Sequence, residues 1–137
     1  MARVLITGGA GFIGSTVAIN SLNRGHEVVV LDNLSSGSIK VLEHLKSLGA
    51  DTIIGDIRDS NSVINAMQGC DAVVHLAAQI SVPASIANPQ ENKSINVEGT
   101  QQILNYCNQF DVKRVVIASS AAVYGQEDRM PLKEENA

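Results

Sequence analysis

Five short apolar segments rich in Val and Ile recur along the chain and predict five β-strands. They do not alternate apolar with polar residues, which is typical of strands that are covered on both faces. Parallel strands flanked by helices have this property, and antiparallel pairing fits the pattern less well. The five segments are VLIT (4–7), EVVVL (27–31), TII (52–54), AVVHLA (72–77) and RVVIAS (114–119).

The segments between these strands carry the spacing of amphipathic helices. Apolar residues at 13, 17, 18 and 22 share one helical face before Gly25, and those at 39, 42, 45 and 48 do so before Gly49. Glycine at these places is a common helix end. We therefore predict one helix before each of the two glycines.

A third helix has the clearest start signal. Asn88 is a favourable N-cap, Pro89 suits the first helical position, and Glu91 stands three residues after the cap. We expect this helix to run to about Asn108.

Alternating strands and helices predict a doubly wound α/β fold of the Rossmann type. Right-handed crossovers then favour a parallel sheet in the order 3-2-1-4-5. No repeat, low-complexity tract or linker divides the 137 residues, so we predict one domain over 1–137.

Composition narrows the classes of partner. The chain is 45% hydrophobic, so it can bury a core, and a net charge of -4 with 3% aromatic residues argues against nucleic acid as a partner. It has neither a signal-peptide pattern nor an apolar run of membrane-spanning length, so we expect a cytoplasmic protein without membrane contact. Cys70 and Cys107 have no metal-type spacing, so we interpret them as reduced core thiols and predict no metal site.

The stretch TGGAGFIG at 7–14 joins the first predicted strand to the first predicted helix. Its G-x-G-x-x-G spacing from Gly9, or G-x-x-G-x-x-G from Gly8, is typical of dinucleotide binding in this context. Gly11 would let a pyrophosphate approach the backbone, Gly14 would let the helix pack closely, and the helix N-terminus would hold the phosphates. A turn with packing duties alone is the competing interpretation. A Walker-type loop is excluded because no Gly-Lys-Ser/Thr follows.

Asp32 ends the second predicted strand, eighteen residues after Gly14. A carboxylate near this spacing accepts from the 2′-hydroxyl of an adenosine ribose and repels a 2′-phosphate. No Arg or Lys lies between Asp32 and Ile39 to bind such a phosphate. The sequence therefore predicts NAD rather than NADP, with an Asp that merely caps a turn as the alternative.

Six motifs in order make the chain resemble the extended short-chain dehydrogenase/reductase family. Within that family it is most similar to the NAD-dependent sugar-nucleotide epimerases of the UDP-glucose 4-epimerase type. The motifs are TGGAGFIG (7–14), DNLSSG (32–37), GDIRD (55–59), HLAAQ (75–79), NVEGT (96–100) and SSAAVYG (119–125).

The resemblance implies NAD as cofactor, a nucleotide sugar such as a UDP-sugar as substrate, and oxidation of the sugar 4-hydroxyl followed by return of the hydride. It also implies a set of cofactor residues. These are Gly8, Gly11, Phe12, Ile13 and Gly14 at the pyrophosphate, Asp32, Asn33, Ser36 and Gly37 around the ribose, Asp56 and Ile57 beside the adenine, and Leu76, Ala77 and Ala78 toward the nicotinamide.

Two residues match catalytic positions of the family. Ser120 would hydrogen-bond the reacting sugar hydroxyl, with Ser119 as the neighbouring alternative, and Asn96 would help organise the site or make a plain structural hydrogen bond. His75 is interpreted as a packed strand-end residue rather than a base. The related dehydratases carry acidic residues directly after the Ser/Thr, whereas this chain has alanines there, so dehydration is disfavoured.

The family's Tyr-x-x-x-Lys general base has no match in the chain. Tyr124 is followed four residues on by Asp128, and Tyr106 by Phe110. We therefore expect the N-terminal part of a longer epimerase, with an incomplete domain and little activity of its own. An exposed sheet edge should promote self-association or marginal stability, and a homo-oligomer is a further expectation. A stand-alone NAD-binding module and another extended reductase are the alternatives.

Overall fold

Five parallel strands form one sheet in the order β3-β2-β1-β4-β5 in the computed structural model, which describes residues 1–126 and 130–136. The predicted order is confirmed, and antiparallel pairing is wrong, because all four strand pairs are parallel. The strands are β1 (Arg3–Thr7), β2 (Glu27–Asp32), β3 (Asp51–Ile54), β4 (Ala72–His75) and β5 (Arg114–Ile117).

Two strands end earlier than the sequence pattern predicts. β4 stops at His75, because its ladder partner Thr7 is the last residue of β1. The next N–H, that of Leu76, donates to the Thr7 carbonyl at 3.2 Å and to the Thr7 hydroxyl at 3.2 Å. β5 stops at Ile117, so Ser119 lies in the segment that follows the strand. The apolar runs therefore extend past the ladder into the loops at the carboxyl edge of the sheet.

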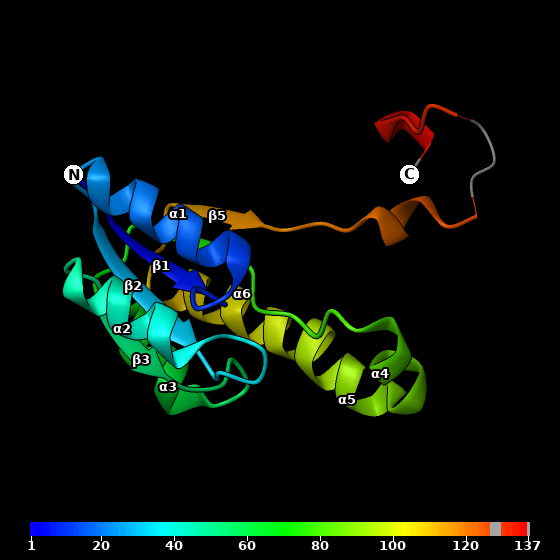
Figure 1. Cartoon of the computed structure of the whole chain (residues 1–137), viewed down its shortest axis with the longest axis horizontal. Coiled ribbons are helices and arrows are strands. Elements are labelled where there is room, and N and C mark those ends of the chain that lie inside the picture. The colour runs from blue at the N-terminus through cyan, green and yellow to red at the C-terminus, as the bar shows by residue number, and fades with distance from the viewer. Residues whose placement is uncertain (127–129, 137) are drawn as a thin grey trace.

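Helices cover both faces of the sheet (Figure 1). On one face Val4 and Ile6 of β1 pack in a cluster with Ala18 of α1 and Leu42 of α2. Leu5 lies between them in β1 and points to the opposite face, as successive strand residues do. The helices are α1 (Phe12–Asn23), α2 (Ile39–Ser47), α3 (Ser60–Met67), α4 (Val82–Ala87), α5 (Pro89–Lys93) and α6 (Thr100–Gln109).

The long helix expected after Asn88 is confirmed as a continuous helical run, with an interior that the sequence pattern does not predict. Residues Ser94–Gly99 are π-helical and join α5 to α6. Two further helices, α3 and α4, were not predicted. α3 has a readable start, because the Asp59 side chain accepts from the N–H of Ser62 at 2.8 Å.

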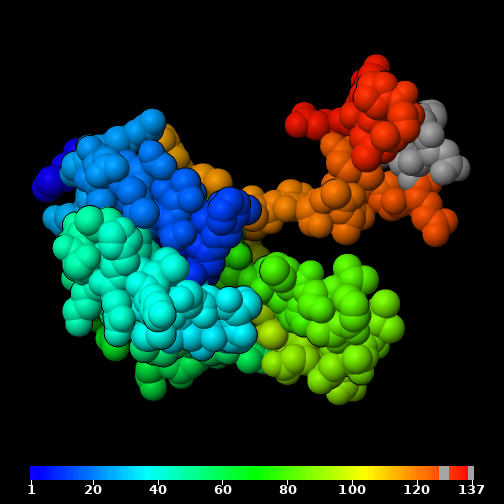
Figure 2. All heavy atoms as spheres, viewed as in Figure 1, coloured from blue at the N-terminus to red at the C-terminus, as the bar shows by residue number. Residues whose placement is uncertain are grey.

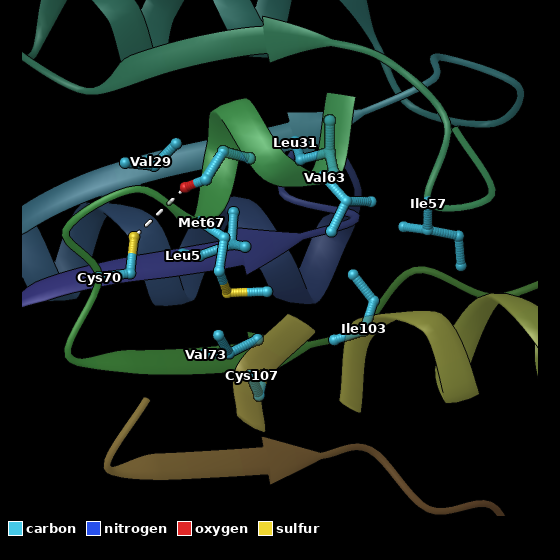
Figure 3. Packing of buried hydrophobic residues seen from close by; sticks show 11 residues of the cluster. Leu5, Val29, Leu31, Ile57, Val63, Met67, Cys70, Val73, Ile103 and Cys107 are labelled. Atoms are coloured by element: carbon cyan, nitrogen blue, oxygen red, sulfur yellow. Dashed lines mark hydrogen bonds between the residues drawn. The ribbon is translucent and has the colours of Figure 1, made fainter. Parts of the chain in front are cut away.

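The second apolar cluster lies between the sheet, α3 and α6 (Figure 3). It contains both cysteines as free, buried thiols, and Cys70 Sγ donates to the Ala66 carbonyl at 3.3 Å. Burial raises the pKa of the Cys70 thiol to about 11 and also raises the pKa of Cys107. The interpretation of both as core thiols is confirmed.

The outer side of β5 is an exposed edge. Its Val116 and Ile117 are 52% and 46% exposed, and β4 is its one strand partner among the described residues. Beyond β5 the chain runs away from the sheet and forms 3-10 turns at Ala121–Tyr124 and Glu134–Asn136 (Figures 1 and 2). The exposed edge is as expected, while self-association stays a prediction. In the described part of the chain, every helix is too short or too polar to cross a membrane.

Candidate functional site

The glycine-rich turn follows β1 directly and is closely packed at two of its glycines. A Cβ at Gly14 would lie 2.2 Å from the Gly8 carbonyl oxygen, and one at Gly8 would lie 2.8 Å from the Ala77 nitrogen. Gly8 also has a φ of 70°, which side chains disfavour. At Gly11 the one close atom is the Gly8 carbonyl oxygen at 3.3 Å. Gly8 and Gly14 thus serve packing, whereas the surface at Gly11 stays open.

The N-terminus of α1 lies at this open surface. Its N-cap is Gly11, and no described side chain caps the first turn. The N–H groups of Phe12 and Ile13 have no intrahelical acceptor, because they belong to the first turn of the helix. Phe12 is 91% exposed and Ile13 is 61% exposed. Together with the positive end of the helix dipole, these donors form a place where an anion such as a phosphate is stabilised.

Asp32 lies at the end of β2 and is 8% exposed. Its Oδ2 accepts from the Ala10 N–H at 2.9 Å, and its Oδ1 accepts from the Leu34 N–H at 2.8 Å. Leu34 has a φ of 58°, so this carboxylate also holds a backbone in the left-handed region. The turn-capping interpretation thus describes part of the geometry. About two further acceptor positions of the carboxylate remain for a ligand.

The loop after β2 folds back onto Asp32 and reaches the loop after β3. A Cβ at Gly37 would lie 2.8 Å from Asp32 Oδ1, and the Asn33 amide donates to Asp56 Oδ2 at 3.0 Å. Ser36 is exposed on the same loop. Figure 2 shows the loop, in cyan, next to the glycine-rich turn, in blue. These two loops and the turn are therefore neighbours at the carboxyl edge of the sheet.

Thr7, which sequence reasoning did not single out, connects this edge to β4. Its hydroxyl oxygen accepts from the N–H groups of Leu76 and Ala77, each at 3.2 Å, and lies 2.6 Å from His75 Nδ1. Both lone pairs are then occupied, so the hydroxyl hydrogen must point to Nδ1. His75 Nε2 consequently carries a hydrogen and donates to Thr100 Oγ1 at 2.9 Å. The position of Thr7 before a double glycine was the available signal.

His75 is 2% exposed, which confirms its interpretation as a packed strand-end residue. Burial lowers the pKa of its imidazole below its ordinary value of 6.5. In addition, a second ring N–H would face a Thr7 oxygen that has no free lone pair. His75 is therefore neutral in the folded chain at pH 7, and the neutral form is part of the hydrogen-bonded line from β1 through β4 to α6.

We expect the free energy of unfolding to fall as the pH drops below 6.5, the ordinary pKa of His75. The unfolded chain then binds a proton that the folded chain resists, so the contribution is present above this pH and is lost below it. Chemical denaturation at pH 7.5 and 5.5 measures the effect. His75→Gln should reduce the difference between the two pH values, while His44→Gln, at an exposed position on α2, should not. Equal pH dependence in both variants would contradict the assignment.

Asn96 lies in the π-helical stretch and holds the loop after β4. Its Oδ1 accepts from the Gln79 N–H at 2.8 Å, and its Nδ2 donates to the Gln79 carbonyl at 3.0 Å and to Asn92 Oδ1 at 2.9 Å. The partly buried amide thus has partners on both sides, as its position on the helix required. Ala78, next to Gln79, is exposed at this loop.

Ser120 is not brought together with these residues. It is exposed, and its hydroxyl accepts from the Ala122 N–H at 3.2 Å at the start of the 3-10 turn after β5. Ser119 is exposed beside it. No hydrogen bond joins Ser120 to Asn96 within residues 1–126 and 130–136. Asp128, which stands four residues after Tyr124, lies outside the described residues.

The profile of the NAD dependent epimerase/dehydratase family matches residues 4–137. The chain belongs to this family. Its members are NAD-dependent, and the Rossmann fold predicted from the sequence agrees with that of its relatives. Within the described residues, His, Cys, Asp and Glu side chains form no group of three that could hold a metal ion.

Three relatives show how far the similarity extends. The UDP-glucose 4-epimerase of Klebsiella pneumoniae is 38% identical over 96% of this chain and 99% of its own length. That of Neisseria meningitidis serogroup C is 38% identical over 98% of this chain but only 41% of its own length. A solved UDP-glucose 4-epimerase from Stenotrophomonas maltophila with bound NAD and formylated UDP-arabinopyranose has a TM-score of 0.90 and 34% sequence identity. The match covers 98% of this chain and 41% of the solved chain. The chain thus spans about two fifths of the length of the latter two.

Proposed function

We propose that this chain is the NAD-binding portion of a UDP-sugar 4-epimerase. The observation that carries the proposal is the uncapped N-terminus of α1 beside the buried carboxylate of Asp32, which holds the Ala10 N–H at 2.9 Å. An N-terminus without a cap fits a pyrophosphate, and a buried acid with free acceptor positions fits a ribose diol. The epimerases similar to this chain support the UDP-sugar as substrate.

In this proposal each loop at the carboxyl edge of the sheet has one part of the cofactor to hold. Gly8, Gly11 and Gly14 shape the turn, and the N–H groups of Phe12 and Ile13 donate to the pyrophosphate. The remaining contacts follow the cofactor outward from its phosphates. They come from Asp32, Asn33, Ser36 and Gly37 at the adenosine ribose, Asp56 and Ile57 at the adenine, and Leu76, Ala77 and Ala78 toward the nicotinamide.

Bound NAD would supply hydride acceptance from the sugar and its return to the opposite face. The chain's own residues bind and orient. Asn96 keeps the loop at Gln79 in place through hydrogen bonds at 2.8 and 3.0 Å. Ser120 would hydrogen-bond the sugar 4-hydroxyl.

The 137 residues alone are expected to bind NAD without significant turnover, because the sequence contains no Tyr-x-x-x-Lys. A lysine lowers the pKa of a neighbouring tyrosine so that it accepts a proton near neutrality. A stand-alone NAD-binding module is the second candidate function, and it rests on the same missing pair. Substantial epimerase activity of the isolated chain would contradict both.

Calorimetric titration of the chain with NAD and NADP tests the proposal. We expect the affinity for NAD to exceed that for NADP by about tenfold or more, since a 2′-phosphate beside Asp32 meets a like charge. No Arg or Lys occurs at residues 33–39 to offset the repulsion. Equal affinities, or no binding of NAD, would refute the assignment of the site.

A further inference from the structure

All three guanidinium nitrogens of Arg58 have hydrogen-bond partners, although its side chain is 33% exposed. Its Nε donates to Asp56 Oδ1 at 2.9 Å, and one terminal nitrogen donates to Asp56 Oδ2 at 2.8 Å. The other terminal nitrogen donates to Glu91 Oε1 at 2.8 Å and lies 3.4 Å from Ser94 Oγ. One guanidinium therefore joins the loop after β3 to the helical run that carries Asn96.

The segment 56–58 is held on this helical run by two further contacts. The Ile57 carbonyl accepts from Gln102 Nε2 at 2.9 Å. The Ile57 side chain packs on Gly99, where an added Cβ would lie 2.6 Å from Ile57 Cδ1. The backbone around Asp56 is thus fixed from the helix side, and Arg58 fixes the carboxylate itself.

The carboxylate of Asp56 has no unused acceptor position in this structure. Oδ1 accepts from the backbone N–H of Arg58 at 2.9 Å and from its Nε, while Oδ2 accepts from a terminal nitrogen of Arg58 and from Asn33 Nδ2. These four bonds use the about four lone-pair positions of a carboxylate. The bond from Asn33, at 3.0 Å, is the one that comes from outside the 56–58 segment. It is the bond that a ligand can replace.

We propose that Arg58 is a positioning residue that orients Asp56 to accept a hydrogen bond from the adenine amino group, which takes the place of the Asn33 amide. This inference rests on the proposed function, because it assumes that NAD occupies the carboxyl edge of the sheet. The contacts of the Arg58 guanidinium are with Asp56, Glu91 and Ser94, so it acts on the adenine through Asp56. The paired bonds from Nε and a terminal nitrogen leave the carboxylate one orientation.

The charge state of Asp56 agrees with this role. The hydrogen bonds from Arg58 hold the pKa of the Asp56 carboxyl well below its ordinary value, so the group is an ionised acceptor at neutral pH. An ionised acceptor favours an amino group and disfavours a carbonyl at the same position. The site should therefore distinguish adenine from hypoxanthine, which has a carbonyl in place of the amino group.

The experiment compares the affinities of the 137-residue chain for NAD and for nicotinamide hypoxanthine dinucleotide by calorimetry. In Arg58→Met, NAD affinity should fall about tenfold while affinity for the hypoxanthine analogue changes less than about twofold, since only the amino group uses the oriented carboxylate. Arg58→Lys keeps the charge but not the paired donors, so it should lose part of the preference. Arg24→Met is the matched control, because Arg24 is exposed and makes no described ion pair.

A double-mutant cycle with Asp56→Asn separates positioning from a general effect on the fold. In the Asp56→Asn background, Arg58→Met should leave the ratio of the two affinities unchanged. The same loss for both dinucleotides, or full preference retained in Arg58→Met and Arg58→Lys, would overturn the inference alone. Failure of the unaltered chain to bind NAD would overturn the proposed function and this inference with it. Should Arg58→Met fail to fold, Arg58→Lys gives the same decision.

Discussion

Replacement of Gly14 by alanine is expected to lower the free energy of unfolding by about 3 kcal/mol or more, because the new methyl group would overlap backbone that cannot move aside. The Cβ would lie 2.2 Å from the Gly8 carbonyl oxygen and 2.7 Å from the Gly9 Cα. Both atoms belong to the turn after β1, and shifting them would disturb the bond from the Gly8 N–H to the Leu31 carbonyl at 2.8 Å. Urea denaturation measures the loss.

Gly11→Ala is the matched control, and it should separate packing from ligand binding. Gly11 has a φ of -83° and a ψ of 177°, which alanine adopts readily, and its Cβ would meet just the Gly8 carbonyl oxygen at 3.3 Å. We expect stability to change by less than about 1 kcal/mol. The methyl group would nevertheless cover the open surface where the pyrophosphate is proposed to approach, so NAD affinity should fall. Equal destabilisation by both substitutions would contradict the division of roles between the two glycines.

Asp32→Ala is expected to lose NAD affinity by about 100-fold, and about 2 kcal/mol of stability, since bonds to a charged acceptor are strong and buried donors are costly to orphan. The lost affinity comes from the ribose hydroxyls. The lost stability comes from the N–H groups of Ala10 and Leu34, which donate to this carboxylate at 2.9 and 2.8 Å. Calorimetric titration and chemical denaturation of the same preparation measure the two effects.

NADP is the internal control for this substitution. Removing the carboxylate also removes the repulsion of a 2′-phosphate, so the affinity for NADP should fall much less than that for NAD or should rise. The preference between the two cofactors would then shrink. Parallel losses for NAD and NADP would show that Asp32 acts through the fold of the turn and not through the ribose.

Most of the fold could be predicted because its signals are local. Non-alternating runs of Val and Ile predict strands that are covered on both faces, and Asn88 with Pro89 predicts a helix start. The limits of β4 and β5 could not be predicted, because strand ends depend on where the ladder partners stop. α3 was missed although Asp59 caps it, since one Asp-x-x-Ser pattern without a long apolar face is a weak signal.

The candidate site also has parts that could be predicted from the sequence and parts that could not. The turn at Gly8 to Gly14 and the acid at Asp32 follow from spacing within one strand-turn-helix-strand unit. The contact of Arg58 with Glu91 joins residues 33 positions apart, and the line from Thr7 through His75 to Thr100 joins three elements. Such contacts exist only once the chain is folded.

The π-helical stretch Ser94–Gly99 changes the rotation of α5 relative to α6 about the helix axis. A π-turn contains one residue more than the α-turn it replaces, so it is equivalent to a single insertion. Deleting one residue there would restore a regular α-helix and rotate everything before it by about 100° relative to α6. Ile103 and Cys107 would keep their places against the sheet, but Glu91 would turn away from Arg58. The extra residue thus allows α6 to pack against the sheet while α5, in the same helical run, contacts the loop after β3.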